Sequence, residues 1–237
     1  MTARQYRRCV AKTTNCLHMT TTATLPVCSA LYKQTLKNTS MPQLNLAHME
    51  LFPTRVWSVS LSTLNEHVPQ WTTQIESWRQ QNPVAEGRSN RMGWNSTQTL
   101  FDDPLFQPLA QAVRTVFDFI FNEMGPPLHR YQLKAWANVH DAGGYNTFHN
   151  HAGALLSACY YLKVPTGSGP IVLRDPRPGA LLSPWQGSLR PNAGSEISIA
   201  PEAGQLLVFP NWLEHGTEAH AGSESRISIP VNAILGI

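Results

Sequence analysis

The chain has 237 residues, of which 42% are hydrophobic, and this suits a soluble domain with a sizeable core. The formal net charge of +3 is unevenly distributed: residues 1–40 hold six of the 18 Lys and Arg residues and no acidic residue. The remainder is therefore net acidic, which argues against nucleic-acid binding. No stretch approaches the roughly 18 uninterrupted apolar residues that suggest a membrane span, so we expect no membrane insertion either.

Residues 1–44 have the composition of a tail. They are rich in Ser and Thr, lack acidic residues, hold three of the four cysteines and show no clear helical apolar stripe. Such a segment resembles an organelle transit peptide, although a translated upstream region fits equally well because Met41 precedes the first orderly sequence. We expect a disordered or targeting-like tail at 1–44 and one domain at 45–237. The protein would then be cytoplasmic, or organellar if the tail is a transit peptide; the lone core cysteine, Cys159, is consistent with a reducing compartment.

The first half of the domain predicts two helices that pack against a sheet. A strand is expected at 50–59, and apolar residues then recur at helical spacing over 64–78, before an Asn-Pro stop. Residues 84–98 are predicted to form a loop because Gly and Asn are frequent there. An Asp-Asp-Pro start signal then introduces a second amphipathic helix over 105–120, which ends before a Gly-Pro-Pro sequence.

From residue 131 the sequence changes to short, β-rich runs separated by turns. Seven or eight such strands after two helices indicate an α+β chain whose second half is an all-β sandwich or barrel. Residues 176–194, rich in Pro, Gly and Ser, form a long connection between strands, and such loops often shape a binding mouth. The expected strands lie at 131–140, 145–151, 155–164, 169–174, 196–200, 205–209 and 226–235.

Three histidines have the spacing of a metal site. His149 and His151 lie two apart on the expected strand at 145–151, and residues two apart in a strand point to the same face. His215 follows a Pro-x-x-Gly turn and a hydrophobic strand, from which it could join them. Imidazole suits iron, zinc, copper or nickel, and three ligands on one face leave positions open for substrate and oxygen. The sequence therefore predicts a metal site at these three histidines.

Several further motifs accompany the histidines in a fixed order. They are Phe-Pro-Thr-x-Val-Trp at 52–57, His149-x-His151, Ser-Ala-Cys-Tyr-Tyr-Leu at 157–162, Asp-Pro-Arg at 175–177, the segment from Gly204 to His215, and Arg-Ile-Ser-Ile-Pro-Val-Asn at 226–232. In combination, residues 49–235 resemble the iron(II)- and 2-oxoglutarate-dependent oxygenase superfamily. The resemblance is strongest to its subgroup of 2OG-Fe(II) oxygenases that open with Phe-Pro-Thr-x-Val-Trp and carry a His-x-His...His motif. The resemblance implies a double-stranded β-helix, or jelly-roll, core with flanking N-terminal helices. It also implies Fe(II) and 2-oxoglutarate as cofactors, molecular oxygen as a co-reactant, and hydroxylation of a substrate with release of succinate and CO2.

The resemblance makes His149 and His215 iron ligands, but it breaks down at His151. The superfamily usually has His-x-Asp or His-x-Glu followed by a distal His, and a neutral imidazole in place of the carboxylate leaves the site one charge unit more positive. Three possibilities stay open. His151 completes a three-His site, it lies behind the ligands with water in its place, or an acid such as Asp141 or Glu214 ligates instead. We favour the first, because only position 151 keeps the two-residue spacing.

Arg226 lies eleven residues after His215, where the resemblance implies an arginine that binds the far carboxylate of 2-oxoglutarate. On a strand it would share a face with Ser228, opposite the alternating apolar residues. A planar guanidinium suits bidentate carboxylate binding, and a hydroxyl two residues on can add a hydrogen bond. Asn138 and Tyr131, on the strand that leads into the site, are further predicted cosubstrate contacts.

Two other functions fit part of the pattern. A cupin-type metal dioxygenase or isomerase would use three histidines without 2-oxoglutarate, but the Glu that a cupin has shortly after its His-x-His is absent here, and His215 lies too far beyond Gly204. A noncatalytic jelly-roll binding module would use the histidines only structurally. The sequence does not choose between a small molecule and a protein side chain as substrate, and it does not indicate the oligomeric state.

Overall fold

The structure, a computed structural model, divides into two compact units, Met1–Pro53 and Thr54–Ile237. In the first unit, β1 (Tyr32–Thr35) pairs antiparallel with β2 (Asn45–His48). The remainder of the predicted tail at 1–44 lies outside the described residues. The described residues are 32–35, 45–48, 52–125, 130–182 and 195–236.

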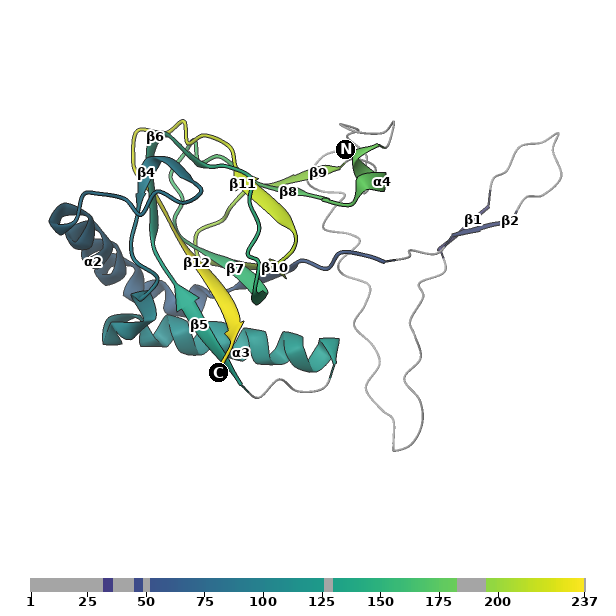
Figure 1. Cartoon of the computed structure of the whole chain (residues 1–237), viewed down its shortest axis with the longest axis horizontal. Helices are drawn as coiled ribbons and strands as arrows, with labels where there is room; N and C mark the ends of the chain where they lie inside the picture. The colour runs from purple at the N-terminus through teal and green to yellow at the C-terminus, as the bar shows by residue number, and fades with distance from the viewer. Residues whose placement is uncertain (1–31, 36–44, 49–51, 126–129, 183–194, 237) are drawn as a thin grey trace. The chain divides into compact units, whose positions relative to one another are not determined.

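In the second unit, α2 (Val68–Gln81) and α3 (Gln107–Met124) pack on one face of a large sheet (Figure 1). Pro69 sits in the first turn of α2, where its missing N–H breaks no helical hydrogen bond. The two predicted helices are therefore confirmed. No helix in the described part of the chain is long and apolar enough to cross a membrane. Short 3-10 turns precede the helices at Ser62–His67, Leu100–Asp102 and Pro104–Phe106.

The large sheet is antiparallel throughout, with the order β3-β10-β7-β12-β6-β4 and with β5 paired to β12. Its central strand β12 pairs with β5, β6 and β7, so backbone hydrogen bonds hold β12 along both of its edges. The strands are β3 (Trp57–Ser60), β4 (Asn90–Asn95), β5 (Tyr131–Ala135), β6 (Asn138–Asn146), β7 (Ala154–Lys163), β10 (Gln205–Pro210) and β12 (Arg226–Leu235).

A smaller antiparallel sheet has the order β11 (Glu214–Thr217), β8 (Ile171–Arg174) and β9 (Glu196–Ile199). A short helix, α4 (Pro178–Leu181), follows β8, and residues 183–194 of the predicted long loop lie outside the described residues. The two sheets enclose a cavity lined by residues of both. This arrangement confirms the predicted α+β class and the jelly-roll core with helices on its outer face.

Alternation along the strands divides the buried residues into two cores. On β7, Tyr160 faces the helices, where its ring meets the edge of Trp71 at 6.3 Å, whereas Tyr161 faces the small sheet. On β10, Leu206 and Val208 likewise belong to the helix-side core, whereas Leu207 and Phe209 belong to the inner one. Successive side chains of a strand point to opposite faces, so each strand supplies both the helix-packed layer and the cavity wall.

Two local predictions were wrong. Residues 84–98 were expected to be a loop but contain β4, which pairs with β6. A separate strand was expected at 145–151, after a turn at Gly143-Gly144. In the structure β6 continues through these two glycines and ends at Asn146, so His149 and His151 lie beyond the strand. Gly143 adopts a φ of 84°, and a Cβ on Gly144 would lie 2.9 Å from the Met92 carbonyl oxygen, so the glycines allow an irregular strand pairing there.

We expect that a chain starting at Met41 folds and binds metal as the full chain does. A start at Met41 removes β1 and leaves β2 without its partner strand, but both hydrophobic cores lie within Thr54–Ile237. Residues 1–40 also lack the apolar periodicity that would offset the entropy of ordering a larger part of them. The melting temperature should change by less than about 4 °C, the shift that roughly 1 kcal/mol causes in a chain of this size. Thermal unfolding and iron content of both proteins test this, and a larger loss of either on truncation would contradict it.

Candidate metal centre

The three predicted histidines meet in the cavity between the two sheets. Ligand nitrogens of His149, His151 and His215 all lie within 4.8 Å of one another. Their ring centroids are 4.3 Å apart for His149 and His215, 5.0 Å for His149 and His151, and 5.1 Å for His151 and His215. The geometry therefore brings together side chains from a loop and from a distant strand into one facing cluster, as a metal site requires.

Backbone hydrogen bonds hold the two histidine segments together. The His149 and His215 N–H groups each donate to the carbonyl of the other residue, at 3.0 Å in both directions. The His151 N–H donates to the Asn211 carbonyl at 3.0 Å, and β11 is anchored in turn by pairing with β8. The sequence predicted that His149 and His151 lie on a regular strand. In the structure an isolated antiparallel bridge between His149 and His215 holds this segment in place instead.

Hydrogen bonds on the far side of two rings prepare them for a metal. His149 Nδ1 lies 2.8 Å from the Thr147 carbonyl oxygen, and His215 Nδ1 lies 2.9 Å from the Leu213 carbonyl oxygen. Because a carbonyl can only accept, each Nδ1 carries the hydrogen and leaves the Nε2 lone pair free. The His151 ring instead packs edge-on against Trp136, with the centroids 5.8 Å apart.

Burial keeps all three imidazoles neutral, which is the form that binds a metal. Burial lowers the pKa of His149, and burial with the neighbouring imidazole lowers the pKa of His151 to about 4. The pKa of His215 falls to about 3 for the same two reasons. Three neutral nitrogen donors suit iron(II) and other first-row metals, so the residues present fit the predicted ion.

The two acids considered as alternative ligands are engaged elsewhere. Asp141 is bound by both terminal nitrogens of Arg79, and the Ser225 hydroxyl donates to it at 2.7 Å. Glu214 lies 3.8 Å from an Arg174 nitrogen at the surface. No carboxylate belongs to the cluster in the described part of the chain, so the geometry favours a site of three histidines.

Arg226 lies on the inner wall of the same cavity. It is only 1% exposed, and neither its Nε nor its Nη1 has a hydrogen-bond partner among the described residues. Ser228 lines the cavity beside it, while Ile227 and Ile229 belong to the helix-side core, which confirms the predicted faces of the strand. A buried cation without a partner is costly, so this wall fits a ligand that brings a carboxylate.

Tyr161 and Ser89 are cavity residues that sequence reasoning missed. The Tyr161 hydroxyl is buried without a partner in the described chain, and the Arg226 guanidinium lies 5.6 Å from its ring. Alternation along 155–164 could have placed Tyr161 on the cavity face. Ser89 Oγ lies 3.5 Å from His149 Nε2 and accepts a hydrogen bond from Asn146 at 3.0 Å. It had no sequence signal, because it precedes the unpredicted strand β4.

Of the two further predicted contacts, one reaches the cavity. Asn138 lies opposite Ser228 in the pairing of β6 with β12 and lines the cavity. Tyr131 is corrected: its hydroxyl donates to an Asp118 carboxylate oxygen at 2.7 Å, and its ring packs against Phe121 on α3. The single strand predicted at 131–140 is in fact two strands, and β5 turns Tyr131 toward the helix.

Comparisons with known proteins agree with this geometry. Residues 134–232 match the family described as "Putative 2OG-Fe(II) oxygenase". This region is therefore similar to the iron(II)- and 2-oxoglutarate-dependent oxygenases. The matched region contains all three histidines and Arg226, so the family match and the cavity concern the same residues. No curated protein matches the sequence.

Solved structures with low sequence identity share the fold of this chain. A Pseudomonas putida prolyl-4-hydroxylase is 12% identical with a TM-score of 0.58, over 78% of this chain and 94% of its own. The epimerase SnoN, solved with Fe3+, alpha-ketoglutarate and nogalamycin RO, is 14% identical with a TM-score of 0.58, over 76% and 79%. HygX from Streptomyces hygroscopicus, solved with nickel and 2-oxoglutarate, is 12% identical with a TM-score of 0.54, over 78% and 84%.

The protein should lose stability in acid partly through His140, which pairs with Arg226 across β6 and β12. Burial lowers the pKa of His140 to about 4, and the nearby Arg226 and His220 add to this. Below the ordinary pKa of 6.5 the unfolded chain takes up a proton that the folded chain refuses, so the free energy of unfolding falls as pH drops from 6.5 to 4. The total contribution is on the order of 3 kcal/mol.

Denaturant unfolding of the iron-free protein at several pH values tests this. His140→Asn should reduce the acid-induced loss of unfolding free energy by about that amount. At pH 8 the imidazole is neutral in both states, so the difference between variant and wild type there provides the baseline. Parallel pH profiles for the two proteins would contradict the assignment.

Proposed function

We propose that this protein hydroxylates a small molecule or a protein side chain, with iron(II) and 2-oxoglutarate as cofactors and molecular oxygen as co-reactant. The observation that carries this proposal is the buried Arg226 guanidinium, which faces the same cavity as three imidazoles whose ligand nitrogens lie within 4.8 Å of one another. A metal site alone does not need a buried cation nearby. A metal site that also holds a dicarboxylate does.

The side chains divide the work within the cavity. His149, His151 and His215 would hold the metal through neutral nitrogens, and Arg226 would pair with the carboxylate of 2-oxoglutarate that is remote from the metal. When bound, iron and 2-oxoglutarate supply the oxidation of an unreactive C–H bond by oxygen, with release of succinate and CO2. Tyr161, whose buried hydroxyl lacks a partner, can add a hydrogen bond to the same carboxylate.

The walls of the cavity serve mainly to exclude water. Phe209 packs against the His215 ring, with the centroids 4.6 Å apart, and Ile171 closes the side formed by the small sheet. These apolar contacts keep the dielectric constant low around the charged groups, which strengthens each ionic contact and limits side reactions. The protein thereby supplies position and charge, while the hard chemistry belongs to the bound groups.

The test is an anaerobic titration of iron(II) and 2-oxoglutarate into the full chain, followed by visible absorption. A charge-transfer band that needs both components is expected, because it reports metal and cosubstrate in one complex. Iron alone and 2-oxoglutarate alone are the controls. Absence of the band, together with no oxygen-dependent formation of succinate, would overturn the proposal.

The same experiment separates the other two functions. Iron binding without any effect of 2-oxoglutarate would favour a cupin-type dioxygenase or isomerase, for which three histidines suffice. Absence of oxygen-dependent chemistry of any kind would favour a noncatalytic binding module. The structural neighbours do not decide the substrate, since one is a prolyl-4-hydroxylase and another was solved with nogalamycin RO.

A further inference from the structure

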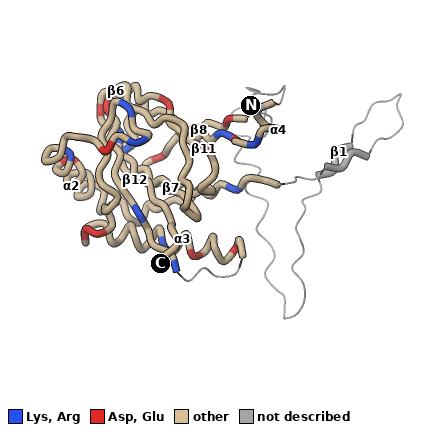
Figure 2. The backbone as a smooth tube through the Cα atoms, viewed as in Figure 1, with Lys and Arg blue, Asp and Glu red and all other residues tan. Residues whose placement is uncertain are grey.

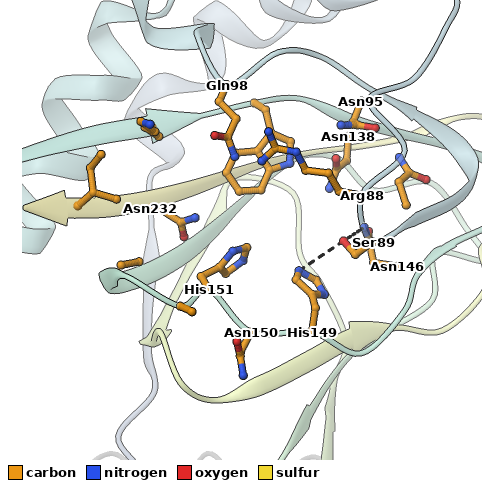
Figure 3. A pocket seen from close by; sticks show the side chains of 16 residues that line it. Arg88, Ser89, Asn95, Gln98, Asn138, Asn146, His149, Asn150, His151 and Asn232 are labelled. Atoms are coloured by element: carbon orange, nitrogen blue, oxygen red, sulfur yellow. Dashed lines mark hydrogen bonds between the residues drawn. The ribbon is translucent and has the colours of Figure 1, made fainter.

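A second pocket opens directly over the histidines, with a volume of about 460 Å³ (Figure 3). It shares Ser89, Trp136 and Asn138 with the inner cavity, and both His149 and His151 belong to the walls of both. Arg226, by contrast, lines only the inner cavity. The inner cavity thus carries the cation that would meet the remote carboxylate of the cosubstrate, and the outer pocket is the approach that a substrate would take to the metal. Its volume is typical of small-molecule sites.

Carboxamides dominate the wall of this outer pocket. Each of the five buried ones is less than a tenth exposed, and no Asp or Glu side chain is part of the wall. A carboxamide offers two donors and one acceptor oxygen, so the wall can bond hydroxyl, amide and anionic groups. The five are Asn90, Asn95, Asn138, Asn146 and Asn232.

Two of these amides, Asn90 and Asn232, keep free hydrogen-bonding groups. The Asn232 side-chain oxygen accepts from the Ser157 hydroxyl at 2.9 Å, which leaves its NH2 group as a donor toward the pocket. Asn90 has no partner for either side-chain atom in the described chain. Buried polar groups without partners are costly, and an apolar ligand would leave that cost in place. The wall therefore fits a ligand with several polar groups.

The charge of the pocket is of one sign. Arg88, just before β4, and Lys134, on β5, both line it, and Figure 3 shows the Arg88 side chain lying across the pocket over the two histidines. Glu86 lies 3.6 Å from Arg88 but outside the pocket wall, and an exposed pair of this kind is weak. Lys134 has no ion-pair partner among the residues that the structure describes. Elsewhere in this unit, charges of both signs are interspersed (Figure 2).

We propose that the substrate is a small anionic molecule, whose carboxylate, phosphate or sulfate group binds to Arg88 and Lys134 while its other polar groups bond to the carboxamides. This inference rests on the proposed oxygenase function and specifies its substrate class. A cationic substrate would meet two like charges and no carboxylate, and an apolar one would leave both cations and the free amides unpaired. Both are therefore disfavoured by the pocket itself.

The test uses the full chain loaded anaerobically with iron(II) and 2-oxoglutarate. An equimolar mixture of hexose, amino-acid and nucleoside derivatives is added, each scaffold present in anionic, neutral and cationic form, and the retained compounds are identified by mass spectrometry after ultrafiltration. We expect anionic forms of at least one scaffold to be retained about tenfold more than their neutral and cationic counterparts, equivalent to ~1.4 kcal/mol. Carboxylate, phosphate and sulfate versions distinguish the anion.

Substitutions of the two pocket cations test whether they cause the preference for anions. Arg88→Gln and Lys134→Gln should each reduce retention of the anions by about tenfold. Arg130→Gln is the matched control, since it removes a positive charge immediately before β5 from a residue outside the pocket wall. Preference for neutral or cationic forms, equal retention of all forms, or retention of none would overturn the inference.

The charge-transfer band of the same samples distinguishes failure of the proposed substrate class from failure of the proposed oxygenase function. If the band forms and no anion is preferred, the substrate class is wrong while the oxygenase function stands. If the band fails to form, the proposed function itself fails.

Discussion

Replacement of Arg226 by alanine should weaken 2-oxoglutarate binding by on the order of 2–5 kcal/mol and leave iron binding intact. The guanidinium is 1% exposed and two of its nitrogens lack partners, so a carboxylate placed against it forms a desolvated, charge-assisted pair. The histidines, in contrast, are held by backbone bonds that do not involve Arg226. The Arg226→Ala variant should therefore lose affinity for 2-oxoglutarate while its affinity for iron stays at the wild-type value.

Arg226→Lys refines the assignment. An ammonium group keeps the charge but cannot form the planar two-point contact, so it should recover only part of the lost affinity. The measurement is the 2-oxoglutarate dependence of the charge-transfer band at saturating iron(II). Arg114→Ala, which removes an exposed guanidinium from α3, serves as the control and should behave as wild type. Equal cosubstrate affinity in wild type and Arg226→Ala would exclude the proposed role.

Polar contacts anchor the start of β12, next to Arg226. Ser225, its neighbour in the chain, donates to Asp141, and Asp141 is held by Arg79 of α2. The Arg79 guanidinium lowers the pKa of Asp141, so that carboxylate remains ionised next to the base of β12. Helix α2 is thereby connected to the start of β12, which carries Arg226, through one ion pair and one hydrogen bond.

The sequence predicted the features that depend on the period of apolar residues or on the spacing of motifs. The helical stripe through Trp71 and Ile75 is buried as predicted, because a repeat of about 3.6 residues fixes one face whatever the partner. The same logic placed Arg226 and Ser228 on the inner face of β12, where strand alternation separates them from the helix-side core. The three-histidine cluster also followed, since its two segments each carried a recognisable pattern.

What the sequence could not show depends on which segments become neighbours. His149 reaches the site through a bridge to His215 that involves only one residue of each segment, so no strand-length pattern announces it. Tyr131 was misplaced because a strand alone does not reveal that it divides and turns toward α3. The outer pocket combines Arg88 and Lys134 from separate elements, and neither residue is distinctive in its own stretch.

His151→Ala should reduce iron affinity by at least on the order of tenfold to hundredfold, the loss that follows removal of groups that merely support metal ligands. The imidazole faces both other rings, with centroid distances of 5.0 and 5.1 Å, and no described carboxylate can take its place. His220→Ala is the matched control, because His220 is buried in the same unit but outside the cluster. Metal content after dialysis against a weak chelator gives the comparison.

His151→Asp then tests what the imidazole does. A carboxylate at this position restores the donor set that is usual in the superfamily, so metal binding should survive, and the site should lose one unit of positive charge. In the wild type the His151 ring packs edge-on against Trp136, with the ring centroids 5.8 Å apart, and the shorter aspartate loses this contact. Because the aspartate still supplies a third ligand, a lower iron affinity of His151→Asp would reflect the lost packing. If His151→Ala binds iron as tightly as wild type, with unchanged spectra, the metal is held by His149 and His215 alone and the third position belongs to water.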